Sequence, residues 1–107
     1  MIDFNCTVQE GVIPDSIRPE LVSGLTRISV SVMGASADDV DVQFTEIPHS
    51  FGFRGGELST TSLVRGQVPA GCEQELRVEF MQQICDMWMQ VTGCSVDELV
   101  VSARDRE

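Results

Sequence analysis

The sequence predicts an α/β fold of the α+β type, in which duplicated β-α-β units form a four-stranded mixed sheet with two helices on one face. The first observation is an internal repeat. The run 34–40 recurs as 93–99, an offset of 59 residues, and four earlier positions recur at an offset of 55. These four are Gly11, Pro14, Glu20 and Leu21, which recur as Gly66, Pro69, Glu75 and Leu76. The two offsets predict an insertion of about one helical turn between Leu76 and Gly93.

The second observation is hydrophobic periodicity, which changes along each repeat. Apolar and polar residues alternate over 2–9, as expected for a half-buried strand. Over 21–32 the apolar residues follow helical spacing, and Gly34 supplies a C-terminal stop. Alternation returns over 40–44. A right-handed crossover makes these two strands parallel.

The second repeat follows the same order with a weaker first strand. Residues 59–64 are polar and poorly patterned, whereas 76–91 carry the apolar side of a helix. Residues 99–103 form the predicted last strand, before a charged tail over 104–107. We therefore predict one domain, 1–107, with pseudo-repeats 1–56 and 57–107. Because one unit of this kind cannot bury its apolar surface alone, the duplication also predicts further assembly.

Composition and charge restrict the functional classes. A chain of 107 residues fits one domain, and its net charge of −10 disfavours nucleic acid and anionic membranes as partners. No apolar run reaches the ~20 residues of a membrane span, and the first residues lack a signal-peptide pattern, so a cytoplasmic protein is expected. Four cysteines without a C-x-x-C pair and a single histidine predict reduced thiols, no metal site and no cofactor.

Two stretches carry a family resemblance. Residues 40–47 read Val-Asp-Val-Gln-Phe-Thr-Glu-Ile, and residues 51–58 read Phe-Gly-Phe-Arg-Gly-Gly-Glu-Leu after a short loop. Together with the turn over 9–11, they resemble the second strand, the hairpin and the first turn of 4-oxalocrotonate tautomerase. The duplication extends the resemblance to the whole chain, in the manner of the fused, longer members of the tautomerase superfamily.

The resemblance implies a trimer and keto–enol chemistry on small 2-oxo acids. The family's base is an N-terminal proline; here Ile2 stands at that position, and the primary amine of Met1 takes its place. The family's arginine after the strand-one glycine corresponds to Val12, with Gln67 as its counterpart in the second half. The arginine at the start of the second strand corresponds to Asp41, which repels a carboxylate. Carboxylate-binding groups must therefore come from other positions.

Seven residues are candidates for the site. The candidates for acid–base catalysis are Met1, through its amine, and His49, the only histidine. The candidates for substrate binding are Ile2, Phe51, Phe53, Arg54 and Arg65. Arg54 lies in the predicted hairpin and Arg65 precedes Gly66 in the predicted repeated turn, so either guanidinium is a candidate to bind a carboxylate. A solvated histidine, surface arginines and phenylalanines at a subunit interface are the alternatives.

Two functional classes follow, together with one variant. The first is a divergent isomerase or lyase that acts on small 2-oxo acids with a site that lacks proline. The second is a catalytically inactive trimeric scaffold that binds a small molecule or a protein. The variant is one subunit of a hetero-oligomeric tautomerase, in which a companion chain supplies the proline.

Overall fold

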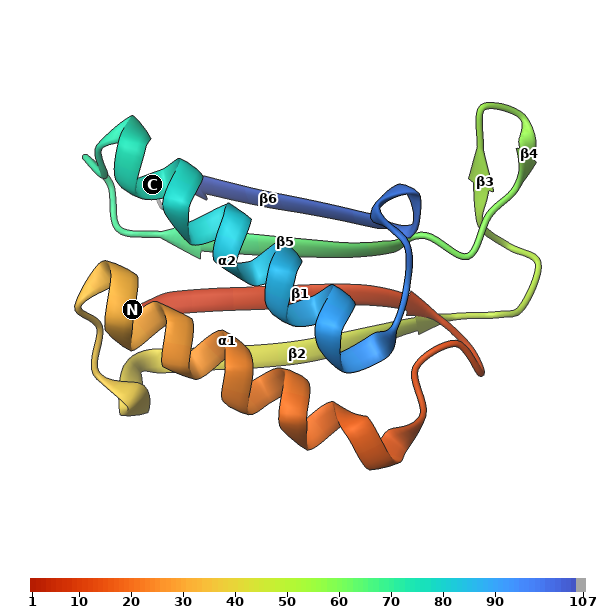
Figure 1. Cartoon of the computed structure of the whole chain (residues 1–107), viewed down its shortest axis with the longest axis horizontal. Coiled ribbons are helices and arrows are strands. Elements are labelled where there is room, and N and C mark those ends of the chain that lie inside the picture. The colour runs from red at the N-terminus through yellow and green to blue at the C-terminus, as the bar shows by residue number, and fades with distance from the viewer. Residues whose placement is uncertain (106–107) are drawn as a thin grey trace.

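A computed structural model describes residues 1–105 and contains a four-stranded sheet with two helices on one face (Figure 1). The strands of this sheet are β1 (Ile2–Gln9), β2 (Val40–Ile47), β5 (Ser62–Val68) and β6 (Leu99–Asp105), and the helices are α1 (Arg18–Met33) and α2 (Gln74–Thr92). A separate hairpin and three short 3-10 helices complete the chain: β3 (Phe53–Arg54), β4 (Glu57–Leu58), η1 (Asp15–Ile17), η2 (Ala37–Asp39) and η3 (Val96–Glu98). Within the described residues, no helix is long and apolar enough to cross a membrane.

The strand order β2-β1-β5-β6 joins the two repeats at the centre of the sheet. β1 runs parallel to β2 and β5 runs parallel to β6, whereas β1 and β5 are antiparallel. The predicted four-stranded mixed sheet with both helices on one face is confirmed. Because the central pair is antiparallel and both helices cover the same face, a pseudo-twofold axis between β1 and β5 relates the two repeats.

The buried layer between sheet and helices explains the alternation in β1. Its core-facing side chains, all at most 2% exposed, are Ile2, Phe4, Cys6 and Val8. Phe4 stacks on Phe80 of α2 with ring centroids 5.9 Å apart. Gly66 gives that ring its room, since a Cβ there would lie 3.1 Å from it, and a Cβ on Gly24 of α1 would lie 2.5 Å from Met87 Sδ of α2. Glycine at these two positions therefore lets central strands and helices approach closely.

The structure corrects the register of the repeat. Gly11 turns the chain just after β1 with a φ of +84°, and the residue in the same role after β5 is Gly71, with a φ of +86°. Gly66 instead lies inside β5. Both helices end at glycines with positive φ, Gly34 and Gly93. The spacing between equivalent residues is thus 60 at the turns and 59 from the helices onward, and α2 contains no one-turn insertion.

The corrected register changes one position carried over from the family. Cys72 follows the turn glycine Gly71 as Val12 follows Gly11. Because the second connection is one residue shorter, Cys72 is also equivalent to Ile13 when residues are counted back from the helix. Gln67, which the sequence placed there, lies on β5 opposite Asp3.

Two strand boundaries also move. The first strand of the second repeat was predicted over 59–64 and is observed over Ser62–Val68. The last strand continues two residues beyond 103, so Arg104 and Asp105 belong to β6 rather than to a tail. The remaining tail residues, Arg106 and Glu107, lie outside the described residues.

Candidate active site

The start of β1 carries two of the predicted site residues. Met1 is 61% exposed, whereas the side chain of Ile2 is fully buried in the core beneath the helices. Alternation along the strand places Ile2 on the helix-covered face and Asp3 on the opposite, open face. Ile2 is therefore a core residue that a substrate does not reach, and Met1 is the accessible group at this end.

The open face of the sheet has a hollow close to this strand start. Its volume is about 330 Å³, and its lining consists of Asp3, Asn5, Arg65, Gly66, Gln67 and Arg104. Arg65 lies in the middle of β5 opposite Asn5, not in a turn, and Arg104 lies opposite Gln67. Among the described residues, neither Arg65 nor Arg104 makes a hydrogen bond or an ion pair. The two guanidiniums outnumber the one carboxylate of the lining, so the hollow has a positive charge balance.

The sequence prediction missed Arg104, because this residue was placed in a solvated tail. The signal that would have found it is the alternation of β6: Ser102 and Arg104 follow Val100 on the same face, while Val101 and Ala103 face the core.

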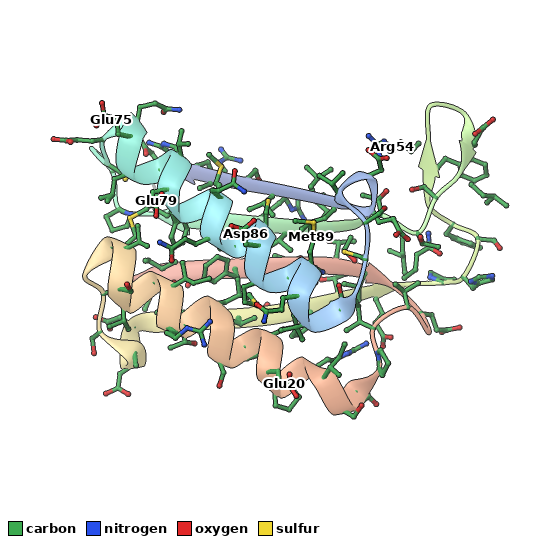
Figure 2. The ribbon with its side chains drawn as sticks, in the orientation of Figure 1. Glu20, Arg54, Glu75, Glu79, Asp86 and Met89 are labelled. Carbon is green, nitrogen blue, oxygen red and sulfur yellow. The ribbon has the colours of Figure 1, made fainter. Side chains whose placement is uncertain are left out.

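The outer face of the helix layer has the opposite charge. Figure 2 shows Glu75, Glu79 and Asp86 on α2 and Glu20 on α1, and all four are exposed. The exposed carboxylates disfavour an anionic ligand on this side, where Arg27 lines the groove between α1 and α2 beside Glu20.

The remaining predicted residues lie at the other end of the sheet. His49, Phe51, Phe53 and Arg54 follow the end of β2, and Ile47 of β2 lies beside Gln9, the last residue of β1. Seven strand steps separate Gln9 from Ile2, which corresponds to roughly 23 Å at ~3.3 Å per step. One chain therefore does not bring Met1 and His49 to a common site (Figure 1).

The hairpin is held at its base and along one arm. Gln9, which is only 2% exposed, donates from Nε2 to the Ser59 carbonyl, and the Ser59 N–H donates to the Gly52 carbonyl at 2.8 Å. Arg54 donates from Nη1 to the carbonyl of Asp97 in η3, and Figure 2 shows it beside that segment. Arg54 thus orients the hairpin as well as presenting an exposed charge.

The hairpin exposes a group of large apolar side chains. Phe51 is 71%, Phe53 66% and Leu58 64% exposed. Such a concentration of exposed apolar surface on a two-stranded element is typical of a contact surface.

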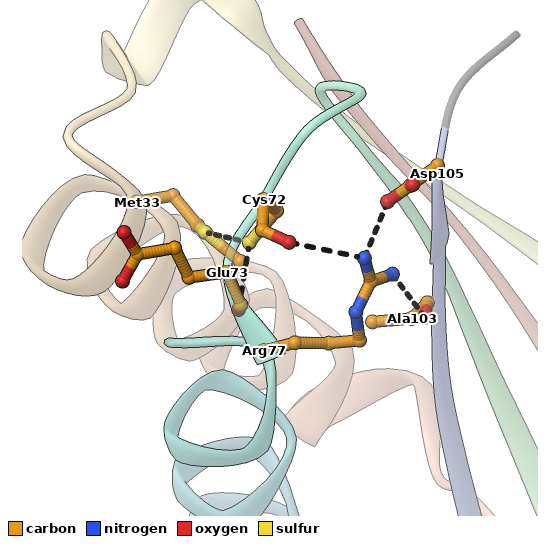
Figure 3. Close-up of polar contacts among 6 residues, drawn as sticks. All are labelled: Met33, Cys72, Glu73, Arg77, Ala103 and Asp105. Carbon is orange, nitrogen blue, oxygen red and sulfur yellow. Dashed lines mark hydrogen bonds and ion pairs between the residues drawn. The ribbon is translucent and has the colours of Figure 1, made fainter. Parts of the chain in front are cut away.

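Two other arginines have a structural role. Arg77 of α2 donates from Nη1 to the Ala103 carbonyl at 3.0 Å and from Nη2 to the Cys72 carbonyl at 3.4 Å, and its Nη2 lies 2.5 Å from Asp105 Oδ1 (Figure 3). We call this group the Arg77 latch, because it fixes the start of α2 to the end of β6. Its guanidinium is fully engaged and is not available to a ligand.

The first repeat contains the equivalent group. Arg18 donates from Nη2 to the Ile13 carbonyl at 3.3 Å and to Glu46 Oε2 at 2.9 Å, and its guanidinium carbon lies 5.3 Å from the Phe44 ring centroid. Each of these three residues lies 59 positions before its equivalent in the Arg77 latch. The equivalents are Arg77 for the arginine, Cys72 for the carbonyl and Asp105 for the carboxylate. The duplication therefore preserves a specific set of contacts, which sequence periodicity did not reveal.

The four cysteines are free thiols. Burial raises the pKa of Cys6 to about 12, and burial is also the main cause of the raised pKa of Cys85. Cys72 Sγ lies 3.8 Å from Met33 Sδ at the N-terminal end of α2 (Figure 3). In the part of the chain that the structure describes, no three potential ligands among His, Cys, Asp and Glu are grouped to hold a metal ion.

Comparison with solved structures identifies the family. The structure of native Ps01740 matches with a TM-score of 0.93 and 31% identity, over 97% of this chain and 93% of that one. A fused 4-OT, described as a wild-type symmetric trimer, matches with a TM-score of 0.87 and 21% identity, over 97% of this chain and 85% of that one. The protein N1, a member of the cis-3-chloroacrylic acid dehalogenase family, matches with a TM-score of 0.92 and 15% identity, over 97% of this chain and 74% of that one.

The chain belongs to the tautomerase superfamily. No family model matches its sequence, and no curated protein matches it either. The fold is thus shared with these structures at 15–31% sequence identity. The open face of the sheet presents Arg65 and Arg104, and neither occupies a position that corresponds to an arginine of the family.

Proposed function

We propose that this tautomerase-superfamily chain binds a small 2-oxo acid in the open-face hollow beside Met1 and catalyses slow keto–enol isomerisation there. The observation that supports the proposal is the pair Arg65 and Arg104. Both line the same hollow, and neither has a partner among residues 1–105, in a chain whose net charge is −10. Planar guanidiniums bind carboxylates through paired hydrogen bonds, so two of them suit the carboxylate of a 2-oxo acid.

The proposed acid–base group is the Met1 amine. The amine is the main-chain nitrogen that directly precedes β1, two residues before Asp3, which lines the hollow. In the proposed reaction, the neutral amine takes a proton from the carbon next to the substrate carbonyl, and the resulting ammonium gives that proton to the enolate oxygen, which becomes the enol hydroxyl; the reverse transfers restore the ketone. An arginine beside the developing enolate oxygen stabilises its charge.

We further propose that the site is completed by assembly into a trimer. The hairpin exposes Phe51, Phe53 and Leu58, and His49 lies at its base, far from Met1 of the same chain. A neighbouring copy is the available source of these groups for a site at the strand start, and fused 4-OT structures are described as trimers. Light scattering after size-exclusion chromatography is expected to give three times the chain mass of 11.7 kDa. A monomer at micromolar concentration contradicts the assembly.

A catalytically inactive scaffold is the second candidate. It is favoured by the burial of Ile2 and by the separation of Met1 from His49 in one chain, since both leave a single protomer without a complete acid–base pair. The cytoplasmic location and the lack of nucleic-acid and membrane partners stay predictions of the sequence.

Calorimetric titration with pyruvate tests the binding site. A charge-assisted contact to a carboxylate contributes about 1.5–3 kcal/mol, so Arg65→Ala and Arg104→Ala are each expected to weaken binding by roughly 10- to 150-fold. Arg27→Ala is the matched control, because Arg27 is an exposed arginine of α1 away from the hollow. If pyruvate does not bind, or if all three variants bind it alike, the hollow is not the site and the scaffold becomes the better account.

A second experiment tests the amine. All seven basic side chains are arginines, so the chain has no lysine to compete for imine formation. Borohydride reduction in the presence of pyruvate is expected to modify one amine, at Met1, as located by peptide mass spectrometry. The rate at which enolised phenylpyruvate ketonises then separates the two candidates. An isomerase raises this rate above that of buffer alone, whereas a scaffold leaves it unchanged.

A further inference from the structure

The open face of the sheet carries its charges in an ordered row near the start of β1. Asp3 lies opposite Gln67 of β5, and Gln67 lies opposite Arg104 of β6. On its other side, Asp3 lies opposite Asp41 of β2. Side chains at paired positions of a sheet face the same side. This row therefore runs from two carboxylates at the β2 end, through an uncharged amide, to a guanidinium at the β6 end.

The next row of the sheet repeats this separation of charge. Asn5 of β1 lies opposite Arg65, so the second guanidinium of the hollow is on β5. Neighbouring strands are about 4.8 Å apart, so the strand of Asp3 is one spacing from that of Arg65 and two spacings, about 10 Å, from that of Arg104. All three charged side chains line the open-face hollow. Its two sides therefore have opposite charges.

The hollow is larger than a simple 2-oxo acid. Its volume of about 330 Å³ corresponds to about eleven water-sized groups at ~30 Å³ each. Pyruvate, whose only substituent is a methyl group, fills about half of this space. A ligand whose carboxylate binds the arginines therefore has room to extend as far as Asp3.

The charge of Asp3 selects the group that such an extension carries. A second ligand carboxylate is repelled by Asp3, and a chain of net charge −10 disfavours a dianion in general. An ammonium or guanidinium instead forms a charge-assisted hydrogen bond with the Asp3 carboxylate. Because a carboxylate accepts several hydrogen bonds, the ligand adds to the contacts that Asp3 already makes.

We propose that the open-face hollow binds a zwitterion, whose carboxylate contacts Arg65 and Arg104 and whose cationic group contacts Asp3. The substrate class is accordingly a 2-oxo acid that carries an ammonium or guanidinium at the end opposite its carboxylate. This inference rests on the proposed function, because the two share one site. Ligands that differ only at the end facing Asp3 separate them.

Three unreactive acids test the proposal by calorimetric titration of the full chain. 5-Aminopentanoate has an ammonium opposite its carboxylate, hexanoate has a methyl group in place of that ammonium, and glutarate ends in a second carboxylate. None contains a ketone, so none forms an imine with Met1 and only binding is measured. 5-Aminopentanoate is expected to bind about tenfold more tightly than hexanoate, and more tightly than glutarate by at least that factor.

Substitutions of Asp3 locate the ammonium. Asp3→Asn keeps the shape of the side chain without its charge, so 5-aminopentanoate and hexanoate are expected to bind this variant within about twofold of each other. Pyruvate is expected to bind it no more weakly than the parent, because a repulsive carboxylate is removed. Asp3→Lys is expected to reverse the order, so that glutarate binds best. Asp86→Asn, on the outer face of the helix layer (Figure 2), is the matched control and keeps the preference for 5-aminopentanoate.

The outcomes distinguish this inference from the proposed function. If pyruvate binds but hexanoate binds as tightly as 5-aminopentanoate, the 2-oxo acid site stands and the zwitterion is wrong. Equal effects of Asp3→Asn and Asp86→Asn on the preference also overturn the inference. If 5-aminopentanoate binds in the expected order and pyruvate does not bind, the zwitterion site stands and the proposed 2-oxo acid function fails. If neither binds, both are wrong.

Discussion

Replacement of Arg77 by alanine tests whether the Arg77 latch stabilises the fold. The Arg77 side chain is 15% exposed and bonds two main-chain carbonyls, of Ala103 and Cys72, as well as the carboxylate of Asp105, whose side chain is 49% exposed. Because Asp105 is half-exposed, the ion pair itself contributes only about 0–1 kcal/mol. The bonds from the charged guanidinium to the two carbonyls contribute about 1.5–3 kcal/mol.

The expected loss of unfolding free energy in Arg77→Ala is therefore about 2–3 kcal/mol, measured by urea denaturation at a fixed protein concentration. Since 1 kcal/mol shifts Tm by roughly 4–8 °C in a domain of this size, Tm is expected to fall by about 10–20 °C. Asp105→Asn removes only the ion pair and is expected to cost about 1 kcal/mol or less. Arg77→Lys keeps the charge without the planar fork and should recover less than half of the loss.

Two outcomes would refute this account of the latch. If Asp105→Asn costs as much as Arg77→Ala, the carbonyl contacts contribute nothing and the ion pair carries the effect. If Arg77→Ala changes stability by no more than the exposed control Arg27→Ala, for which we expect less than about 0.5 kcal/mol, the latch has no role in stability. Arg18→Ala should resemble Arg77→Ala, because it breaks the equivalent group in the first repeat.

Two further predictions concern the hairpin and the thiols. A Cβ at position 52 would overlap Gln9 Nε2 and lie 2.9 Å from the Ser59 carbonyl, so Gly52→Ala should displace the hairpin and lower the proposed trimer fraction in light scattering on dilution. Glu57→Ala is the control, and an unchanged trimer would separate the hairpin from assembly. The Cys6 pKa of about 12 is raised above the ~8.5 of an unfolded thiol. The stability it contributes is full below pH 8.5 and is lost as pH rises toward 12, by about 1.4 kcal/mol per pH unit. Cys6→Ala should flatten this slope, and with no tyrosine or lysine in the chain, an unchanged slope would refute the assignment.

The elements that could be predicted from sequence are those whose burial is one-sided. β1 buries every second residue and α1 buries one face, so the hydrophobic periodicity of both elements is apparent in the amino-acid sequence. The predicted register of the repeat was wrong because Gly66, like Gly11, is a glycine three residues before a proline. Gly66 is a glycine for another reason, the space taken by the Phe4 ring, and that reason exists only in the packed sheet.

The candidate site was harder to predict than the fold. Arg65 was chosen for its place in a turn that does not exist, yet it lies on the open-face hollow, because strand alternation puts it there. Its neighbour Arg104 lies 39 residues later in the chain, on β6, and only the pairing of β5 with β6 brings the two together.

The joining of two β-α-β units in one chain has an evolutionary consequence. When identical single units pair around a true twofold axis, every substitution is made at both ends, so an end can improve only if its twin tolerates the same residue. Here the central pairing of β1 with β5 is kept within one polypeptide, and each end mutates independently. Trp88 of α2, for example, stands where α1 has Ser29, 59 residues earlier. In the fused chain, substitutions at one end of the sheet are therefore selected independently of the other end, while both ends keep the same β1–β5 pairing.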